Sequence, residues 1–214
     1  MGRDMPKALV EVAGIPLLVR TLRRFECVDL VDEAVVVAPP KHLREVQNSL
    51  KEAFPETSIR GIEGGEERQI SVANGLAAFD EGTELVVIHD AARPFVGEQA
   101  IREAIKAAQR TGAATVAVPC VDTILESDED GMLAATPDRN RLWACQTPQV
   151  FALEVIRAAY KKAEDLGTMY TDDATLVRAA GHKVRIVPGS PENFKITTQS
   201  DLAFAEFLIR QGTV

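Results

Sequence analysis

Residues 85–95 read Leu85-Val86-Val87-Ile88-His89-Asp90-Ala91-Ala92-Arg93-Pro94-Phe95, an apolar run that leads directly into an Asp and then an Arg. A short, continuous apolar run is typical of a strand that is buried on both faces, as in a parallel sheet. Ligands of open α/β sheets bind at the carboxyl ends of the strands. Asp90 is therefore placed to hold a metal or a ribose, and Arg93 to hold a phosphate. The simpler interpretation is a polar turn that follows a core strand.

The segments around this strand alternate between predicted strands and predicted helices. Further strands are expected at residues 34–38, 113–119 and 184–187. Helices are expected at residues 42–53, 66–79, 98–110, 153–166, 172–180 and 201–210, the last two capped by Thr171 and Ser200. This order predicts an α/β fold with a Rossmann-like, mostly parallel sheet flanked by helices. The 214 residues are expected to form a single domain.

Residues 121–149 interrupt this alternation, because they show no helical period. The turn signal Asp128-Glu129-Asp130-Gly131 separates two short segments, 122–126 and 132–136, and predicts a β-hairpin. We expect a protruding β-arm over about residues 121–142, inserted within the domain. An excursion of this length is typical of a functional element or an oligomer contact, and a plain surface hairpin is the simpler alternative.

The composition bears on partners and compartment. A net charge of −8 gives no argument for a nucleic-acid or anionic-membrane partner, so a phosphate-bearing substrate must be bound by a local cluster of Lys and Arg. No apolar run approaches the roughly 20 residues that span a membrane, and we expect no secretory leader. Cys27, Cys120 and Cys145 are far apart and show no metal or disulfide spacing, which favours the reducing cytoplasm.

A second candidate site is the glycine pair in Gly64-Gly65-Glu66-Glu67-Arg68-Gln69-Ile70-Ser71. Two glycines allow a ligand to approach the backbone, and the start of a helix offers free N–H groups. Ser71 lies three residues after Arg68 and is expected on the same face of the helix. An ordinary loop-to-helix turn explains the same pattern.

Isolated polar residues complete the candidate set. Lys7, after a proline, and Lys195, in a short polar segment, could each hold a phosphate, although a lone Lys is usually solvated surface. Arg139 lies at the far end of the hairpin, and Thr147 offers a hydroxyl. His89 should point to the opposite face of the strand from Asp90, so we expect it to be structural.

Six motifs together resemble those of the 2-C-methyl-D-erythritol 4-phosphate cytidylyltransferase family. They are residues 87–94, the pattern Gly64-Gly65-x-x-Arg68-x-x-Ser71-Val72-x-x-Gly75-Leu76, Asp122-Thr123, Thr147-Pro148-Gln149, Thr171-Asp172-Asp173 and residues 193–197. They follow the family's order over nearly the whole chain. The resemblance implies an enzyme that transfers a cytidylyl group from CTP to 2-C-methyl-D-erythritol 4-phosphate, with release of pyrophosphate, in isoprenoid precursor synthesis.

The resemblance also implies roles at the nucleotide. Lys7 and Lys195 match lysines on the nucleotide phosphates, and Asp90 matches the ligand of Mg²⁺ and of the CTP ribose. The loop that selects cytosine is matched by Gly65, Glu66 and Ser71. Displacement at phosphorus needs in-line positioning and positive charge rather than a covalent protein intermediate, so these residue types suit the reaction.

The resemblance further implies how the acceptor is bound. The residues around the sugar phosphate are matched by Arg93, Thr123, Arg139 and Thr147. In the family the β-arm swaps across a homodimer, so Thr123 and Arg139 would serve the partner's active site. An acidic chain can bind two polyanions when its cations converge locally.

The start of the chain departs from the family pattern, in which a strand and a loop of the type Ala-Ala-Gly-x-Gly-x-Arg-Met come first and Met1 matches the Met. We therefore expect an interrupted sheet and weak CTP binding or no activity for this polypeptide. Restoring about twenty upstream residues and measuring pyrophosphate release tests this expectation. Two alternatives remain: a ribitol-5-phosphate cytidylyltransferase with the same fold and nucleotide site, and a non-catalytic nucleotide-binding dimer.

Overall fold

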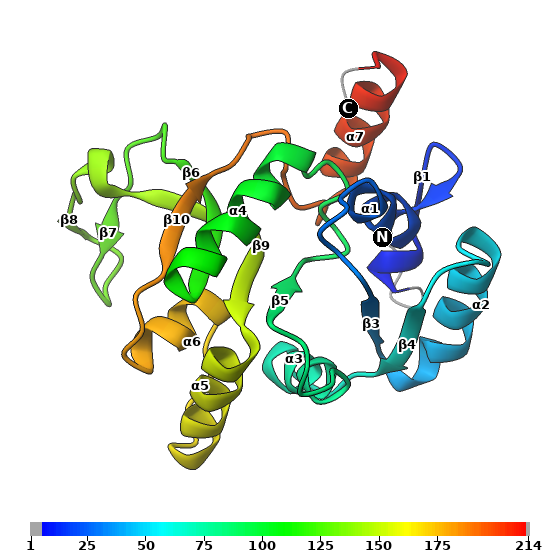
Figure 1. Cartoon of the computed structure of the whole chain (residues 1–214). Coiled ribbons are helices and arrows are strands. Elements are labelled where there is room, and N and C mark those ends of the chain that lie inside the picture. The colour runs from blue at the N-terminus through cyan, green and yellow to red at the C-terminus, as the bar shows by residue number, and fades with distance from the viewer. Residues whose placement is uncertain (1–5, 213–214) are drawn as a thin grey trace.

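The computed structural model describes residues 6–212, and its main sheet has four strands in the order β10-β6-β9-β5 (Figure 1). These strands are β5 (Leu85–Ile88), β6 (Ala113–Pro119), β9 (Trp143–Ala152) and β10 (Arg185–Pro188). β10 is parallel to β6, whereas β9 is antiparallel to both β6 and β5. Three strands therefore share one direction and β9 runs against them, so the carboxyl ends of β5 and β10 lie at the same edge of the sheet.

A separate parallel pair, β3 (Ala34–Ala38) and β4 (Ile59–Glu63), lies on the side of β5 away from β9 (Figure 1). Within residues 6–212 no strand pairs with the second edge of β3 or of β5, so the sheet is interrupted as expected. The expectation that β5 is fully buried is wrong, because only Val86 of its four residues is buried. In the described part of the chain, β5 is an edge strand of the main sheet, so no neighbouring strand covers its second edge and its side chains stay partly exposed.

Helices cover both faces of the main sheet. The helices of residues 6–212 are α1 (Leu17–Glu26), α2 (Leu43–Ala53), α3 (Arg68–Ala77), α4 (Glu98–Thr111), α5 (Leu153–Asp165), α6 (Asp173–Ala179) and α7 (Gln199–Arg210). Among them, α2 packs against the separate β3–β4 pair and α7 packs near the start of the described chain. On β9, Val150 packs with α4 and β6, whereas the next residue, Phe151, packs with α3, α5 and α6. Adjacent strand residues point to opposite faces, so one strand contributes to two apolar clusters.

Several helix starts differ from their predicted positions, and α2 begins one residue late, at Leu43. The helix expected at 66–79 begins at Arg68, so Glu66 stays in the preceding loop. Asp172, and not Thr171, caps α6, because its carboxylate accepts both the N–H and the hydroxyl of Thr175 at 2.8 Å. Thr198, and not Ser200, caps α7, where it forms a reciprocal capping box with Asp201.

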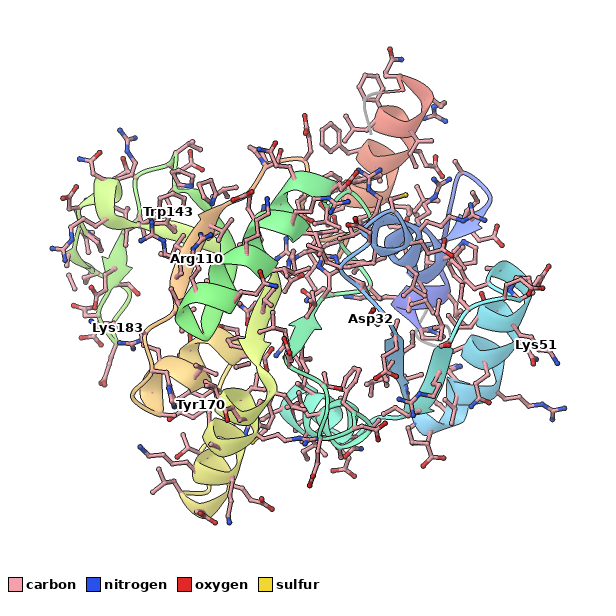
Figure 2. All side chains as sticks on the ribbon, viewed as in Figure 1. Asp32, Lys51, Arg110, Trp143, Tyr170 and Lys183 are labelled. Carbon is pink, nitrogen blue, oxygen red and sulfur yellow. The ribbon has the colours of Figure 1, made fainter. Side chains whose placement is uncertain are left out.

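The predicted hairpin is confirmed. β7 (Glu126–Ser127) and β8 (Leu133–Ala135) pair antiparallel, and the Asp128 carboxylate closes their turn by accepting the N–H groups of Asp130 and Met132. Figure 1 shows this arm extending beyond β10, at the opposite side of the sheet from β3. Trp143, labelled in Figure 2, lies at its base. Large apolar side chains on the arm are exposed: Val121, Ile124, Leu125, Met132 and Leu133.

The smaller elements lie near the start of the described chain, between β3 and α2, and within the arm. They are the short helices η1 (Lys7–Leu9), η2 (Pro40–His42) and η3 (Arg139–Arg141), and the hairpin of β1 (Glu11–Val12) and β2 (Ile15–Pro16). None of the helices within residues 6–212 is both long and apolar enough to cross a membrane.

Candidate functional site

Three charged side chains meet beyond the carboxyl ends of β5 and β10. Lys195 Nζ donates to Asp90 Oδ2 at 2.9 Å, and Arg93 Nε lies 3.5 Å from the same oxygen. The Asp90 and Arg93 side chains are 18% and 13% exposed, whereas that of Lys195 is 44% exposed. One carboxylate is therefore held between two cations, one of which faces solvent.

The charge state of Asp90 follows from these neighbours. Burial alone would raise the pKa of its carboxyl group. The hydrogen bond and charge of Lys195 act in the opposite direction, together with the charges of Arg68 and Arg93, and hold the pKa below its ordinary value. Asp90 is thus an ionised oxygen donor at neutral pH.

Arg93 connects the two segments on which the site is built. Its Nη1 donates to the carbonyl of Asn193 at 2.8 Å, in the loop that carries Lys195, and its Nη2 lies 3.4 Å from the carbonyl of Cys145 on β9. The Asn193 side chain donates in turn to Gln146 Oε1 and to the Thr147 carbonyl, at 3.1 and 2.8 Å. The loop after β10 is thereby fixed against β9.

Thr147 lies beside this cluster, and its side chain faces into the protein. Its hydroxyl accepts from the Asp90 N–H at 3.1 Å and lies 2.9 Å from His89 Nδ1, with 5% of the residue exposed. The histidine that the sequence predicts to be structural therefore contacts a candidate site residue. The sequence gives no signal for this contact, because His89 follows β5 and Thr147 lies on β9, 58 positions further along the chain.

The glycine loop before α3 is closed by Ser71. The Ser71 hydroxyl accepts from the Gly65 N–H at 3.1 Å and donates to the Gly65 carbonyl at 3.3 Å. A Cβ on Gly65 would lie 2.5 Å from Cβ of Ile70, so this position needs glycine for close packing as well as for any ligand. Glu66 is exposed in this loop.

A partly buried ion pair joins α3 to α6. Arg68 Nη2 donates to Asp173 Oδ2 at 2.7 Å, and the Tyr160 hydroxyl donates to Asp173 Oδ1 at 2.5 Å. Asp173 is 1% exposed. Burial would lower the pKa of Arg68, but its bond to Asp173 outweighs this and raises it; burial and Asp173 both raise the pKa of Tyr160. The sequence reasoning missed this pair, whose members are 105 positions apart.

Some predicted site residues lie outside the charged cluster. Lys7 is exposed on η1 and forms no ion pair within residues 6–212. Thr123 and Arg139 lie on the arm, where Arg139 Nη1 donates to the Val121 carbonyl at 2.8 Å. The structure thus brings Asp90, Arg93, Thr147 and Lys195 together and leaves the arm residues at a distance from them in the fold.

Asp90 is the carboxylate of this cluster that could serve as a metal ligand. Residues 6–212 contain no group of three or more His, Cys, Asp or Glu side chains that could hold a metal ion. Mg²⁺ is commonly bound by one or two carboxylates together with waters and substrate phosphates. A single ionised carboxylate beside two cations fits that pattern.

The fold and the site define an α/β nucleotide-binding protein, with its charged groups at the carboxyl edge of the sheet. Residues 1–211 match the family described as IspD: 2-C-methyl-D-erythritol 4-phosphate cytidylyltransferase. The chain belongs to this family.

Individual relatives agree with the family match. The 2-C-methyl-D-erythritol 4-phosphate cytidylyltransferases of Syntrophus aciditrophicus and Caldanaerobacter subterraneus are 45% and 43% identical to the chain over 212 residues, which is 99% of this chain and 91% and 93% of the relatives. The crystal structure of 4-diphosphocytidyl-2C-methyl-D-erythritol synthase from Anaerococcus prevotii superposes with a TM-score of 0.89 at 32% identity, covering 98% of this chain and 92% of that one. The crystal structure of the 2-C-methyl-D-erythritol 4-phosphate cytidylyltransferase from Thermus thermophilus superposes with a TM-score of 0.81 at 36% identity. The match covers 96% of this chain and 94% of that one.

Proposed function

We propose that the protein transfers the cytidylyl group of CTP to 2-C-methyl-D-erythritol 4-phosphate and releases pyrophosphate. The observation that carries the proposal is the Asp90–Arg93–Lys195 cluster, which lies in a chain 45% identical to a relative named for this activity. The cluster supplies what the reaction requires, namely fixed positive charge and one metal-binding carboxylate.

The reaction needs no covalent protein intermediate. A phosphate oxygen of the acceptor attacks the α-phosphorus of CTP, and the bond from that phosphorus to the bridging oxygen of the β-phosphate breaks. Lys195 neutralises negative charge that develops at the α-phosphate, and Lys7 binds the remaining nucleotide phosphates. Arg93 holds the acceptor phosphate, so that attack occurs in line with the leaving group.

Asp90 is the protein ligand that we propose for magnesium and for the CTP ribose. A magnesium ion held by Asp90 would supply positive charge to the leaving pyrophosphate. Because Asp90 is a single carboxylate, substrate phosphates and water would complete the coordination, as is usual for Mg²⁺ at nucleotide sites. The glycine loop, through Gly65, Glu66 and Ser71, selects the cytosine base.

The protein acts as a homodimer in this proposal. The arm of each subunit covers its partner, so that Thr123 and Arg139 complete the partner's acceptor pocket with Arg93 and Thr147. Support comes from the exposed apolar side chains of the arm, among them Leu125 and Leu133 at 62% and 63% exposure. The three free cysteines favour a cytoplasmic location.

The experiment is a pyrophosphate-release assay with CTP and Mg²⁺, in which methylerythritol phosphate and ribitol 5-phosphate compete as acceptors. At CTP concentrations high enough to offset the weak CTP binding expected above, we expect the methylerythritol product to form. Asp90→Ala should abolish this turnover, whereas Asp80→Ala, at an exposed position outside the cluster, should retain it. Preference for ribitol 5-phosphate supports the alternative acceptor. CTP binding without turnover of either acceptor identifies a non-catalytic protein and overturns the proposal.

A further inference from the structure

Both ring nitrogens of His89 are hydrogen-bonded within the protein. Nδ1 lies 2.9 Å from Thr147 Oγ1, and Nε2 lies 3.0 Å from the carbonyl oxygen of Arg93. The ring also packs edge-on against Phe25, with 5.0 Å between ring centroids. The imidazole therefore has no free nitrogen to offer a ligand, and both of its hydrogen bonds are to residues of the candidate site.

The partners of His89 determine where its proton lies. A carbonyl oxygen can only accept, so Nε2 carries the hydrogen and donates to Arg93. In a neutral imidazole only one nitrogen carries a hydrogen, so Nδ1 is the acceptor. The Thr147 hydroxyl must then donate to Nδ1, while its oxygen accepts the Asp90 N–H at 3.1 Å.

These bonds form one continuous series. It runs from the Asp90 N–H to the Thr147 hydroxyl, then to the His89 ring, and from the ring to the Arg93 carbonyl. The Arg93 N–H donates to the Asp90 carbonyl at 3.0 Å and closes the turn between them. A single side chain thus holds both ends of the turn that carries Asp90 and Arg93.

We propose that His89 is a positioning residue for the transfer reaction, acting through Thr147 and the Arg93 carbonyl on the backbone of Asp90 and Arg93. The catalytic part of this inference rests on the proposed function, in which Asp90 serves the nucleotide and metal and Arg93 serves the acceptor. His89 then sets the position of Asp90, which binds the nucleotide, relative to Arg93, which binds the acceptor. A displacement of about 1 Å between reacting groups can cost about a hundredfold in rate.

Two substitutions separate this role from simple packing. His89→Phe keeps an aromatic ring but removes both hydrogen bonds, whereas His89→Gln offers an amide oxygen to Thr147 and an amide N–H to the Arg93 carbonyl. The matched control is His42→Phe, at a histidine 9% exposed that bonds to Glu45 on α2. Circular dichroism and thermal unfolding establish that each variant folds.

We expect His89→Phe to lower kcat about 10- to 100-fold while KM for CTP changes by no more than about threefold. His89→Gln should recover most of kcat, and His42→Phe should keep it. An unchanged kcat in His89→Phe overturns the proposal. The proposal is also overturned if kcat falls equally in His89→Phe and His89→Gln and in proportion to their loss of thermal stability. That result is expected of a residue that serves packing alone.

Amide hydrogen exchange at Asp90 tests the positioning without reference to catalysis. The Asp90 N–H should be protected in the wild type and in His89→Gln, and should exchange about tenfold faster or more in His89→Phe. Unchanged protection in His89→Phe overturns the inference. If the wild type transfers no cytidylyl group, the proposed function is wrong. Loss of Asp90 N–H protection in His89→Phe would still show that His89 positions the turn at residues 90–93.

Discussion

Lys195 Nζ and Asp90 Oδ2 are 2.9 Å apart, and this bond joins the loop after β10 to the end of β5. The carboxylate is largely buried and the ammonium is nearly half exposed, so the lysine can turn to an incoming phosphate while Asp90 stays in place. Lysine is suited to such an exchange, because its ammonium is a compact point charge on a flexible stem. The pair therefore marks where we expect phosphate charge to enter the site.

Replacement of this lysine should impair chemistry more than folding. We expect Lys195→Met to lower kcat by about 10²- to 10³-fold, as is typical when one group that stabilises transition-state charge is removed. Lys195→Arg should retain part of the rate. Lys183→Met, at an exposed lysine before β10, is the matched control and should behave as the wild type (Figure 2). A kcat in Lys195→Met within about twofold of wild type would exclude the assigned role.

Asn193 should be sensitive to an isosteric change. In Asn193→Asp the amide that donates to Gln146 Oε1 and the Thr147 carbonyl becomes a carboxylate facing two acceptors. Loss of the bonds at this 2% exposed position should lower the free energy of unfolding by about 2–3 kcal/mol and reduce turnover. Denaturant unfolding measures the first effect. Asn74→Asp, at an exposed amide bonded to the Glu63 carbonyl, should cost much less.

The Arg68–Asp173 pair predicts a non-additive result. Arg68→Met leaves the Asp173 carboxylate buried with only Tyr160 as a partner, and we expect a loss of about 2–4 kcal/mol in unfolding free energy. Asp173→Asn removes the uncompensated charge, so the double variant should be more stable than Arg68→Met alone. Chemical denaturation of the four proteins gives the coupling energy. Additive losses would show that the two side chains do not act as a pair.

The capping box of α7 predicts a pH dependence. Backbone N–H groups of Thr197 and Thr198 hold the pKa of Asp201 to about 2, below its ordinary value of 3.8. The folded state therefore gains stability from ionised Asp201 at pH values above 3.8, and loses it as the pH falls toward 2. Unfolding temperatures of the wild type and Asp201→Asn should differ at pH 7 and converge near the lower pH. A constant difference across this range would contradict the assignment.

The arm can be tested by complementation between two inactive variants. Asp90→Ala damages the body of the site and Arg139→Ala damages the arm. If arms swap, a heterodimer of the two, isolated with two affinity tags, has one intact site and should regain about half of the wild-type activity. A heterodimer no more active than its parents would place Arg139 in its own subunit's site, and a monomeric protein would exclude the arrangement.

Local patterns were sufficient to predict much of this architecture. The apolar run before Asp90 identified a strand, and the turn at 128–131 identified the hairpin, while the functional site at the end of that strand stays a prediction. β9 was not predicted, because residues 143–152 lack apolar–polar alternation and contain Pro148, which argues against an interior strand. The structure tolerates this proline because residues 146–148 pair with neither β6 nor β5.

Contacts between distant segments could not be read from the sequence. Arg68 and Asp173 each have an ordinary local explanation, as a residue near a helix start, and only the tertiary fold makes them a pair. The same holds for His89 and Thr147, whose contact depends on how β9 passes the end of β5. The exposure of β5 followed from an open strand edge, which the composition of the strand itself does not reveal.

The register shift between β6 and β9 leaves residues 146–148 outside the main-chain ladder. The position of Thr147 therefore depends on side chains that reach it from elsewhere, His89 from one direction and Asn193 from another. A segment held in a ladder moves only with its whole strand. A segment held by side chains can instead be displaced by a single substitution. Residues 146–148 are therefore where single substitutions could most readily change the geometry of the site during evolution.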